Sequence, residues 1–207
     1  MEDYNISRGK HFYTIGLSYK KADAEVRGHF SLDEEAKKKL LEQAKNEGID
    51  ELLVTSTCNM TEIYGFAQHP FQLIKLLCEH TLGTIEEFEK VAYVYKNKEA
   101  ISHMFRVGTG LDSQILGDFE IISQLKVAFK QSKKAGVANP FFERLVNAVI
   151  QASKRIKNET DISSGATSVS FASVQYILNN YKNPADQNIL LFGTGKIGRN
   201  TCENLVK

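Results

Sequence analysis

The order of strand-like and helix-like segments in the first hundred residues constrains the fold more than any other feature of this chain. Four segments are predicted strands because they are short, rich in β-forming residues and partly alternating in polarity: residues 11–19, 51–57, 61–68 and 91–95. Helical patterns separate the first strand from the second and the third from the fourth. The order strand, helix, strand, strand, helix, strand predicts an α+β fold that opens with a ferredoxin-like βαββαβ subdomain.

Local signals predict where these two helices begin and end. Ser31 is the expected N-cap of the first helix, because Glu34 follows three residues later in capping-box spacing. Gly48 is the expected stop of that helix. Pro70 fits the first turn of the second helix, where a missing N–H costs no hydrogen bond.

A helical subdomain is expected next, because helical patterns run from residue 100 to about residue 181 with breaks at glycines. Asn139 and Pro140 predict one helix start within it, as N-cap and first helical residue. Residues 188–192 (NILLF) are predicted to be a short apolar strand. The expected parts are one domain over residues 1–160, a linker helix over residues 161–185 and the first βα unit of a Rossmann-like domain over residues 186–207.

The last predicted strand runs into a G-x-G-x-x-G turn made of Gly193, Thr194, Gly195, Lys196, Ile197 and Gly198. Glycines at this spacing allow a tight turn, close approach of the backbone to a pyrophosphate and close packing of the next helix. The alternative is a glycine-rich turn of some other α/β sheet. A nucleotide-binding fold needs several more strands, so we expect this chain, ending at Lys207, not to hold a dinucleotide by itself.

A dense polar cluster with one thiol follows the second predicted strand. Thr57, Cys58 and Asn59 lie at its centre, and such hydroxyl and amide groups can orient a carbonyl substrate. The thiolate form of cysteine is a strong nucleophile, which makes Cys58 a candidate catalytic residue. The alternative is a small buried apolar residue, the commoner role of a cysteine. Cys78 and Cys202 are interpreted as core residues of helices.

A third cluster surrounds a predicted loop between Gly110 and Gly117. A loop with several polar side chains is a plausible place for function. Its candidate site residues, with those of the neighbouring helices, are His103, Ser113, Asp118, Phe119, Glu120 and Gln124. A lone helical histidine is more often structural or exposed, which is the alternative for His103.

Composition and charge exclude several classes of protein. A net charge of +1 argues against a strongly basic nucleic-acid-binding protein. Basic residues nevertheless gather on predicted helices and either contact phosphates or form a solvated face: Lys126, Lys130, Lys133, Lys134, Lys154, Arg155 and Lys157. No apolar run reaches the ~20 residues of a membrane span, and no apolar signal segment opens the chain. Three widely spaced cysteines predict neither a disulfide framework nor a metal site, so we expect a cytoplasmic protein with reduced thiols.

These clusters together resemble the glutamyl-tRNA reductase family over nearly the whole chain. The family's Ser-Thr-Cys-Asn-Arg-Thr-Glu-Ile-Tyr signature resembles residues 56–64, with Met60 in place of arginine. Its Gly-Leu-Asp-Ser-x-x-Leu-Gly-Glu-Pro-Gln-Ile segment resembles residues 110–121, with Asp-Phe-Glu in place of Glu-Pro-Gln. Shorter matches are Gly16-Leu17-Ser18-Tyr19-Lys20, Glu25-Val26-Arg27 and residues 166–170.

The resemblance implies a two-step reduction of glutamyl-tRNA to glutamate-1-semialdehyde, on the route to tetrapyrroles. Cys58 would take the glutamyl group as a thioester, and hydride from NADPH would reduce it. The resemblance makes Thr57, Asn59 and Met60, with the loop candidates, substrate-binding residues, and it gives His103 a supporting catalytic role. Residues 1–160 would then be the catalytic, glutamyl-tRNA-binding domain. Residues 186–207 would begin the NADPH-binding domain.

The resemblance also implies partners. These are glutamyl-tRNA and the downstream glutamate-1-semialdehyde aminomutase. The family's dimerisation region would lie beyond Lys207, so a homodimer is expected of a full-length protein and this fragment could be monomeric.

The departure at Met60 leaves alternatives open. A guanidinium there would clamp the free side-chain carboxylate of glutamate, and a thioether cannot. Either another cation substitutes, or glutamate binds weakly, or the chain has been altered at this position. A non-catalytic tRNA- or partner-binding module of the same fold, and a different thiol-dependent acyl or aldehyde dehydrogenase, are the alternative functions.

Overall fold

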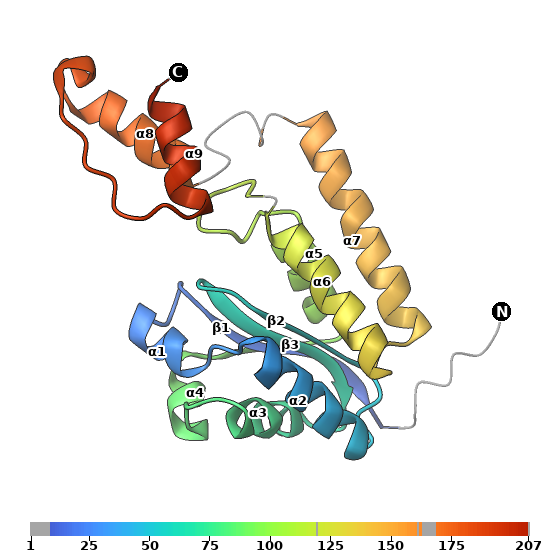
Figure 1. Cartoon of the computed structure of the whole chain (residues 1–207). Coiled ribbons are helices and arrows are strands. Elements are labelled where there is room, and N and C mark those ends of the chain that lie inside the picture. The colour runs from blue at the N-terminus through green and yellow to red at the C-terminus, as the bar shows by residue number, and fades with distance from the viewer. Residues whose placement is uncertain (1–8, 119, 161, 163–168, 207) are drawn as a thin grey trace.

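A computed structural model of the chain describes residues 9–118, 120–160, 162 and 169–206. All four expected strands in the first hundred residues form one antiparallel sheet: β1 (His11–Ser18), β2 (Leu52–Ser56), β3 (Met60–Ala67) and β4 (Tyr93–Lys96). Their order across the sheet is β2-β3-β1-β4, so β1 and β3 are central (Figure 1). The mixed α/β class predicted from the sequence is therefore confirmed.

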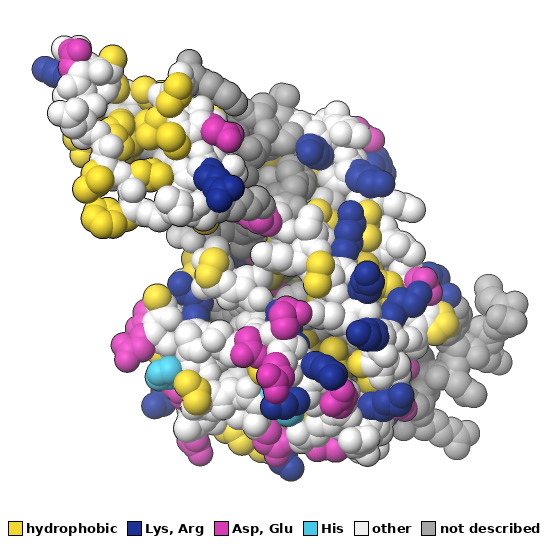
Figure 2. Space-filling model, in the orientation of Figure 1, with side chains coloured by type: hydrophobic (Ala, Val, Ile, Leu, Met, Phe, Trp, Pro, Cys, Tyr) yellow, Lys and Arg dark blue, Asp and Glu magenta, His cyan; other side chains and the backbone are white. Residues whose placement is uncertain are grey.

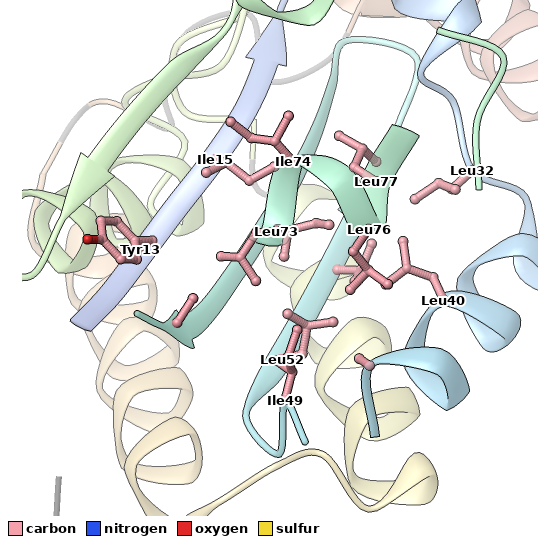
Figure 3. Close-up of a cluster of buried hydrophobic side chains, with 14 of the residues drawn as sticks. Tyr13, Ile15, Leu32, Leu40, Ile49, Leu52, Leu73, Ile74, Leu76 and Leu77 are labelled. Carbon is pink, nitrogen blue, oxygen red and sulfur yellow. The ribbon is translucent and has the colours of Figure 1, made fainter. Parts of the chain in front are cut away.

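Four helices pack on one face of the sheet. These are α1 (Ala24–His29), α2 (Glu34–Asn46), α3 (Pro70–Glu79) and α4 (Ile85–Val91). Figure 3 shows the core between this layer and the sheet, where Leu40, Leu73 and Leu76 point toward Ile15 and Leu52. Fully burying one such side chain contributes about 1.5–3 kcal/mol, so this layer supplies much of the free energy of folding.

A second layer of three helices covers the opposite face. It consists of α5 (Lys98–Gly108), α6 (Glu120–Ala135) and α7 (Pro140–Glu159). Its core contains Phe12, Leu53, Met104 and Phe142. Because side chains of a strand alternate between faces, Phe12 lies in this layer while Tyr13 and Ile15 lie together in the core on the opposite face. Both faces of the sheet are thus buried, and polar residues within it need partners.

Three of the helix boundaries predicted from the sequence are confirmed, and one is wrong. Gly48 follows α2 with a φ of +75°, Pro70 opens α3, and the side chain of Asn139 accepts a hydrogen bond from the Phe142 amide at 2.9 Å. The predicted cap at Ser31 is wrong, because Asp33 caps α2 and accepts from the Ala36 amide at 2.8 Å.

The short helix α1 explains the difference at Ser31, whose hydroxyl donates to the Gly28 carbonyl at 2.8 Å and so belongs to the end of that helix. Neither α1 nor α4 was expected from the sequence. Each is about two turns long or less and begins at a side-chain cap, Asp23 in α1 and Thr84 in α4.

The last part of the described chain contains α8 (Val169–Asn180), a 3₁₀ turn (Pro184–Asp186) and α9 (Lys196–Leu205). The predicted strand over residues 188–192 is wrong: within residues 169–206 no strand is formed. Leu190 and Phe192 are 81% and 92% exposed, because no described strand lies beside them to pair and pack. Cys202, expected in a core, is exposed as well. Among the described residues, the helices are too short or too polar to cross a membrane.

Candidate functional site

One pocket collects most of the residues that the sequence singled out. It lies where the β2–β3 turn, the loop before α6, the first turns of α6 and the two C-terminal helices meet. The predicted residues that line it are Thr57, Cys58, Asn59, Met60, His103, Ser113, Asp118, Glu120, Gln124 and Ile197. Phe119 lies outside the described residues, as does the side chain of Lys196. Gly193, Thr194, Gly195 and Gly198 do not line the pocket.

The turn between β2 and β3 presents Cys58 at its tip. The Thr57 hydroxyl oxygen accepts hydrogen bonds from the amides of Asn59 and Met60, both at 3.2 Å. The Thr57 amide donates to the Met60 carbonyl at 2.8 Å, which closes the turn. The Asn59 carbonyl accepts from the Tyr19 amide at 2.8 Å. The backbone is thus held on both sides of Cys58, whose side chain is exposed.

Arg27 of α1 fixes the same turn from outside the sheet. Its Nε donates to the Cys58 carbonyl at 3.0 Å, and a terminal guanidinium nitrogen donates to the Ala22 carbonyl at 2.6 Å. Arg27 belongs to the short family match Glu25-Val26-Arg27, and no role was expected of it. Its contact spans 31 residues of chain, so local patterns could not reveal it.

His103 lies buried on α5 and is bound by a carboxylate from the sheet. Its Nε2 is 2.5 Å from Oε1 of Glu62, which is fully buried on β3. The Tyr93 hydroxyl donates to the same oxygen at 2.5 Å, and the Tyr64 hydroxyl donates to Oε2 at 2.6 Å. Three donors compensate the loss of water around this carboxylate, because charge-assisted hydrogen bonds are the strong ones.

The two tyrosines remain donors because their hydroxyls resist ionisation. Burial, followed by the nearby charge of Glu62, raises the pKa of Tyr64 and of Tyr93 well above the ordinary value for a phenol. Gly16 makes room for the carboxylate, since a Cβ there would lie 2.8 Å from Cγ of Glu62 and 2.7 Å from the Thr61 carbonyl oxygen. A charged residue inside an otherwise apolar strand was the signal that could have identified Glu62.

The second nitrogen of His103 faces the loop before α6. Nδ1 is 3.5 Å from Oδ2 of Asp112, too long for a normal hydrogen bond, and no other described group bonds to it. Asp112 Oδ1 pairs with Lys20 Nζ at 2.5 Å, and that hydrogen bond raises the pKa of Lys20. A continuous polar row therefore runs from the surface at Lys20 through Asp112 and His103 to Glu62.

Two glycines shape the loop that carries Asp112 and Ser113. Gly110 and Gly117 have φ values of +74° and +80°, and the Gly117 amide donates to the Gly110 carbonyl at 3.1 Å. Side chains with a Cβ rarely adopt such φ values, so glycine is needed at both positions. The loop expected between these residues is confirmed.

The lining of the pocket is acidic. Four carboxylates line it, those of Glu62, Asp112, Asp118 and Glu120, while its described lining includes neither lysine nor arginine. Met60 occupies one wall at the start of β3. The nearest cation of the polar row, Lys20, reaches the pocket only through Asp112.

The glycine-rich turn before α9 has the backbone features that its spacing predicts. Gly193 has a φ of +105°, and a Cβ on Gly198 would lie 2.1 Å from the Gly193 carbonyl oxygen. A Cβ on Gly195, the N-cap of α9, would meet nothing within 4 Å, which leaves the approach to the helix start open. Ile197 of this turn and Val169 of α8 line the same pocket as Cys58.

The sequence of the chain matches one protein family and several named relatives. The family described as "Glutamyl-tRNAGlu reductase, N-terminal domain" matches residues 15–160. The chain is 83% identical over all 207 residues to a protein named glutamyl-tRNA reductase from Christiangramia forsetii, and 74% identical to one from Flavobacterium psychrophilum. It spans about half the length of each, 50% in both cases.

A solved structure titled glutamyl-tRNA reductase from Methanopyrus kandleri shares the fold. Its TM-score is 0.67 at 24% identity, over 94% of this chain and 46% of the other. At that identity the likeness concerns the fold alone. Because the family profile covers most of the sequence, the chain belongs to the family of the glutamyl-tRNA reductase N-terminal domain.

Proposed function

We propose that this chain is the glutamyl-tRNA-binding part of an NADPH-dependent glutamyl-tRNA reductase, in which Cys58 accepts the glutamyl group. The observation that carries the proposal is the position of Cys58: an exposed thiol at the tip of a doubly anchored turn, on the pocket that His103 also lines. A structural cysteine would instead be packed in the core, as Cys78 partly is.

In the proposed step the Cys58 sulfur attacks the carbonyl carbon of the ester that joins glutamate to the 3′ end of its tRNA. A carbon–sulfur bond forms, the carbon–oxygen bond to the ribose breaks, and the departing 3′ oxygen takes up the proton that the Cys58 thiol gives up. The products are a glutamyl thioester and free tRNA. Sulfur suits this role because it is strongly nucleophilic.

In this proposal His103, which lines the same pocket as Cys58, would orient the substrate or handle the thiol proton. Glu62 fixes its ring through Nε2, so Nδ1 is the ring nitrogen that would bond to the substrate or the thiol. Thr57, Asn59, Ser113 and Gln124 would contact the substrate, as would Asp118 and Glu120. Phe119 belongs to the same proposal, although it lies outside the described residues.

The glycine-rich turn fits the pyrophosphate of a dinucleotide. Backbone amides at Gly193, Gly195 and the first turn of α9 would hold it, since Gly195 leaves the helix start open and helix N-termini attract anions. Thr194, Lys196 and Ile197 complete the predicted cofactor-binding segment. When bound, NADPH would supply the hydride that reduces the thioester to glutamate-1-semialdehyde.

The layout of domains and partners follows from the same proposal. The strand order β2-β3-β1-β4 supports a ferredoxin-like subdomain, with α5, α6 and α7 as a helical subdomain within residues 1–160. Residues 161–185 would link it to the nucleotide-binding part, which begins at residue 186. The unstable aldehyde product would pass to glutamate-1-semialdehyde aminomutase, and a homodimer would form through segments outside this chain.

A non-catalytic tRNA-binding module is the second candidate, and the acidic pocket favours it. The glutamyl side chain is an anion, and neither lysine nor arginine is found in the described lining, where Met60 stands in place of the family's arginine. Such a module would bind tRNA without forming a covalent bond.

Labelled acyl transfer separates these candidates. The chain is incubated with tRNA carrying labelled glutamate, without NADPH, then acid-quenched and separated from the tRNA. The reductase proposal predicts that glutamyl-tRNA transfers label to the wild-type protein and transfers none to the Cys58→Ser variant. A non-catalytic module would show tRNA binding without label, and a different thiol-dependent dehydrogenase would accept label only from donors that lack tRNA.

A further inference from the structure

The exposed face of α6 and α7 carries a charge opposite to that of the rest of the chain. Residues 120–159 contain eight Lys or Arg and three Asp or Glu, a net charge of +5. Since the whole chain carries +1, the remaining residues carry −4. Figure 2 shows Lys and Arg side chains in a row over these two helices.

The lysines of α6 lie opposite its buried side. Lys126, Lys130, Lys133 and Lys134 recur at helical spacing and are exposed, while Ile122, Leu125 and Ala128 are buried against the core. An α-helix whose outer face is this basic repels itself unless an anion neutralises it.

Half of these eight cations have no ion pair within the described part of the chain. Lys133 pairs with Glu143 at 3.1 Å, and Arg155 pairs with Glu159 at 3.2 Å. Lys126, Lys130, Lys134 and Lys154 are exposed and make no ion pair with any described residue. Elsewhere, surface lysines of α2 and α3 such as Lys39 and Lys75 do have a carboxylate partner.

The basic face begins close to the candidate site along α6. Glu120 and Gln124, in the first two turns of α6, line the pocket, and the exposed Lys126 follows two residues later on the outer side of the helix. At 1.5 Å per residue, the ten residues from Gln124 to Lys134 extend about 15 Å away from the pocket. A polynucleotide whose 3′ end enters the pocket must leave it along some path, and the outer face of α6 and α7 offers a path with several unpaired cations.

We propose that the outer face of α6 and α7 binds the phosphate backbone of the tRNA whose 3′ end enters the Cys58 pocket. The proposal rests on the function proposed above, and it names Lys126, Lys130, Lys134 and Lys154 as the residues that meet phosphates. These contacts are electrostatic and carry no base specificity, so they set affinity and its salt dependence.

The test compares two triple variants by their affinity for uncharged glutamate-accepting tRNA across a range of salt concentrations. One variant is Lys126→Ala, Lys130→Ala and Lys134→Ala. The control removes the same charge from the opposite layer, through Lys39→Ala, Lys75→Ala and Lys90→Ala. The first should weaken binding and reduce the salt slope by about one unit per lysine, and the control should match the wild type. Melting temperatures verify that both remain folded.

An equal salt slope in the two variants, or no binding by the wild type, overturns the proposal; an acidic protein as the true occupant would give the first result. A minimal donor, glutamate esterified to the 3′ hydroxyl of adenosine, tests the Cys58 chemistry separately. Label transferred from that donor at wild-type level in the α6 variant shows that the pocket is intact, whatever the tRNA result. Failure of the minimal donor to label wild-type Cys58 counts against the proposed function instead.

Discussion

Glu62 is a fully buried carboxylate that accepts from three donors, and one of them is the ring of His103. Its partners come from β3, β4 and α5, and His103 is 41 residues away in the chain. Sequence clusters identified Cys58, His103 and Ser113 as candidates, because each has polar neighbours nearby. They could not identify Glu62 or Asp112 as partners of His103, because the fold alone brings those side chains together.

Replacing Glu62 by glutamine keeps the shape and removes the charge. Glu62→Gln puts a donor where one of the three donors now bonds, which should lower the free energy of unfolding by about 1–3 kcal/mol. The acylation rate of Cys58 should fall by about tenfold or more, because His103 loses the carboxylate that fixes its ring. Glu89→Gln, at an exposed position of α4, is the control. A wild-type acylation rate in Glu62→Gln would show that Glu62 does not act through His103.

Met60 is the residue at which the pocket departs furthest from its expected chemistry. Met60→Arg adds the only cation to a described lining that holds four carboxylates, and a charge-assisted hydrogen bond to the glutamyl carboxylate is worth about 1.5–3 kcal/mol. We expect acylation by glutamyl-tRNA at low concentration to rise by about tenfold, measured as rate over concentration. Met60→Leu controls for the change of side chain. No gain over that control would mean that the glutamyl carboxylate does not lie beside position 60.

The three cysteines should differ in reactivity. Burial, followed by the nearby charges of Glu86 and Glu79, raises the pKa of the Cys78 thiol to about 11, whereas Cys58 and Cys202 are exposed. At pH 8 only about one Cys78 thiol in a thousand is then ionised, and the thiolate is the form that reacts. Iodoacetamide followed by peptide mass spectrometry should find Cys58 and Cys202 modified well before Cys78. Early modification of Cys78 would contradict the described packing of α3.

At the scale of elements, sequence patterns located most of the structure. Periodicity identified the helices α2, α3, α5, α6 and α7 because each buries one recognisable face. The four strands were predicted from their β-forming residues and partial alternation of polarity. The short helices α1 and α4 were not predicted, since a helix of fewer than eight residues is too short to show a clear helical period of polarity. The segment over residues 188–192 has a strand composition, but no described strand pairs with it.

Capping at α2 provides a test of element boundaries. Asp33→Ala removes the side chain that accepts from the Ala36 amide and should lower the free energy of unfolding by about 1 kcal/mol, measured with chemical denaturant. Ser31→Ala removes a single exposed hydrogen bond to Gly28 and should cost less. A larger loss for Ser31→Ala would restore the cap that the sequence predicted.

At the scale of the whole molecule, charge and shape divide the chain into regions with different tasks. One helical layer packs on the sheet and stabilises it, and the other carries a basic outer face beside an acidic pocket (Figures 1 and 2). The C-terminal helices bring Val169 and Ile197 to that same pocket, so the glycine-rich turn and the thiol lie on one cavity. Spacing along the sequence could not predict that the pocket lining is negatively charged. Nor could it predict that the C-terminal helices line the same pocket as Cys58.

Mass spectrometry of the chain after exposure to glutamyl-tRNA tests the central claim most directly. The wild type and Cys202→Ser, which lacks the other exposed cysteine, should each gain the mass of one glutamyl group, mapped to the peptide that contains Cys58. Cys58→Ser should gain none. An adduct on any other residue, or an equal adduct on Cys58→Ser, would contradict the assignment of Cys58 as the acyl acceptor.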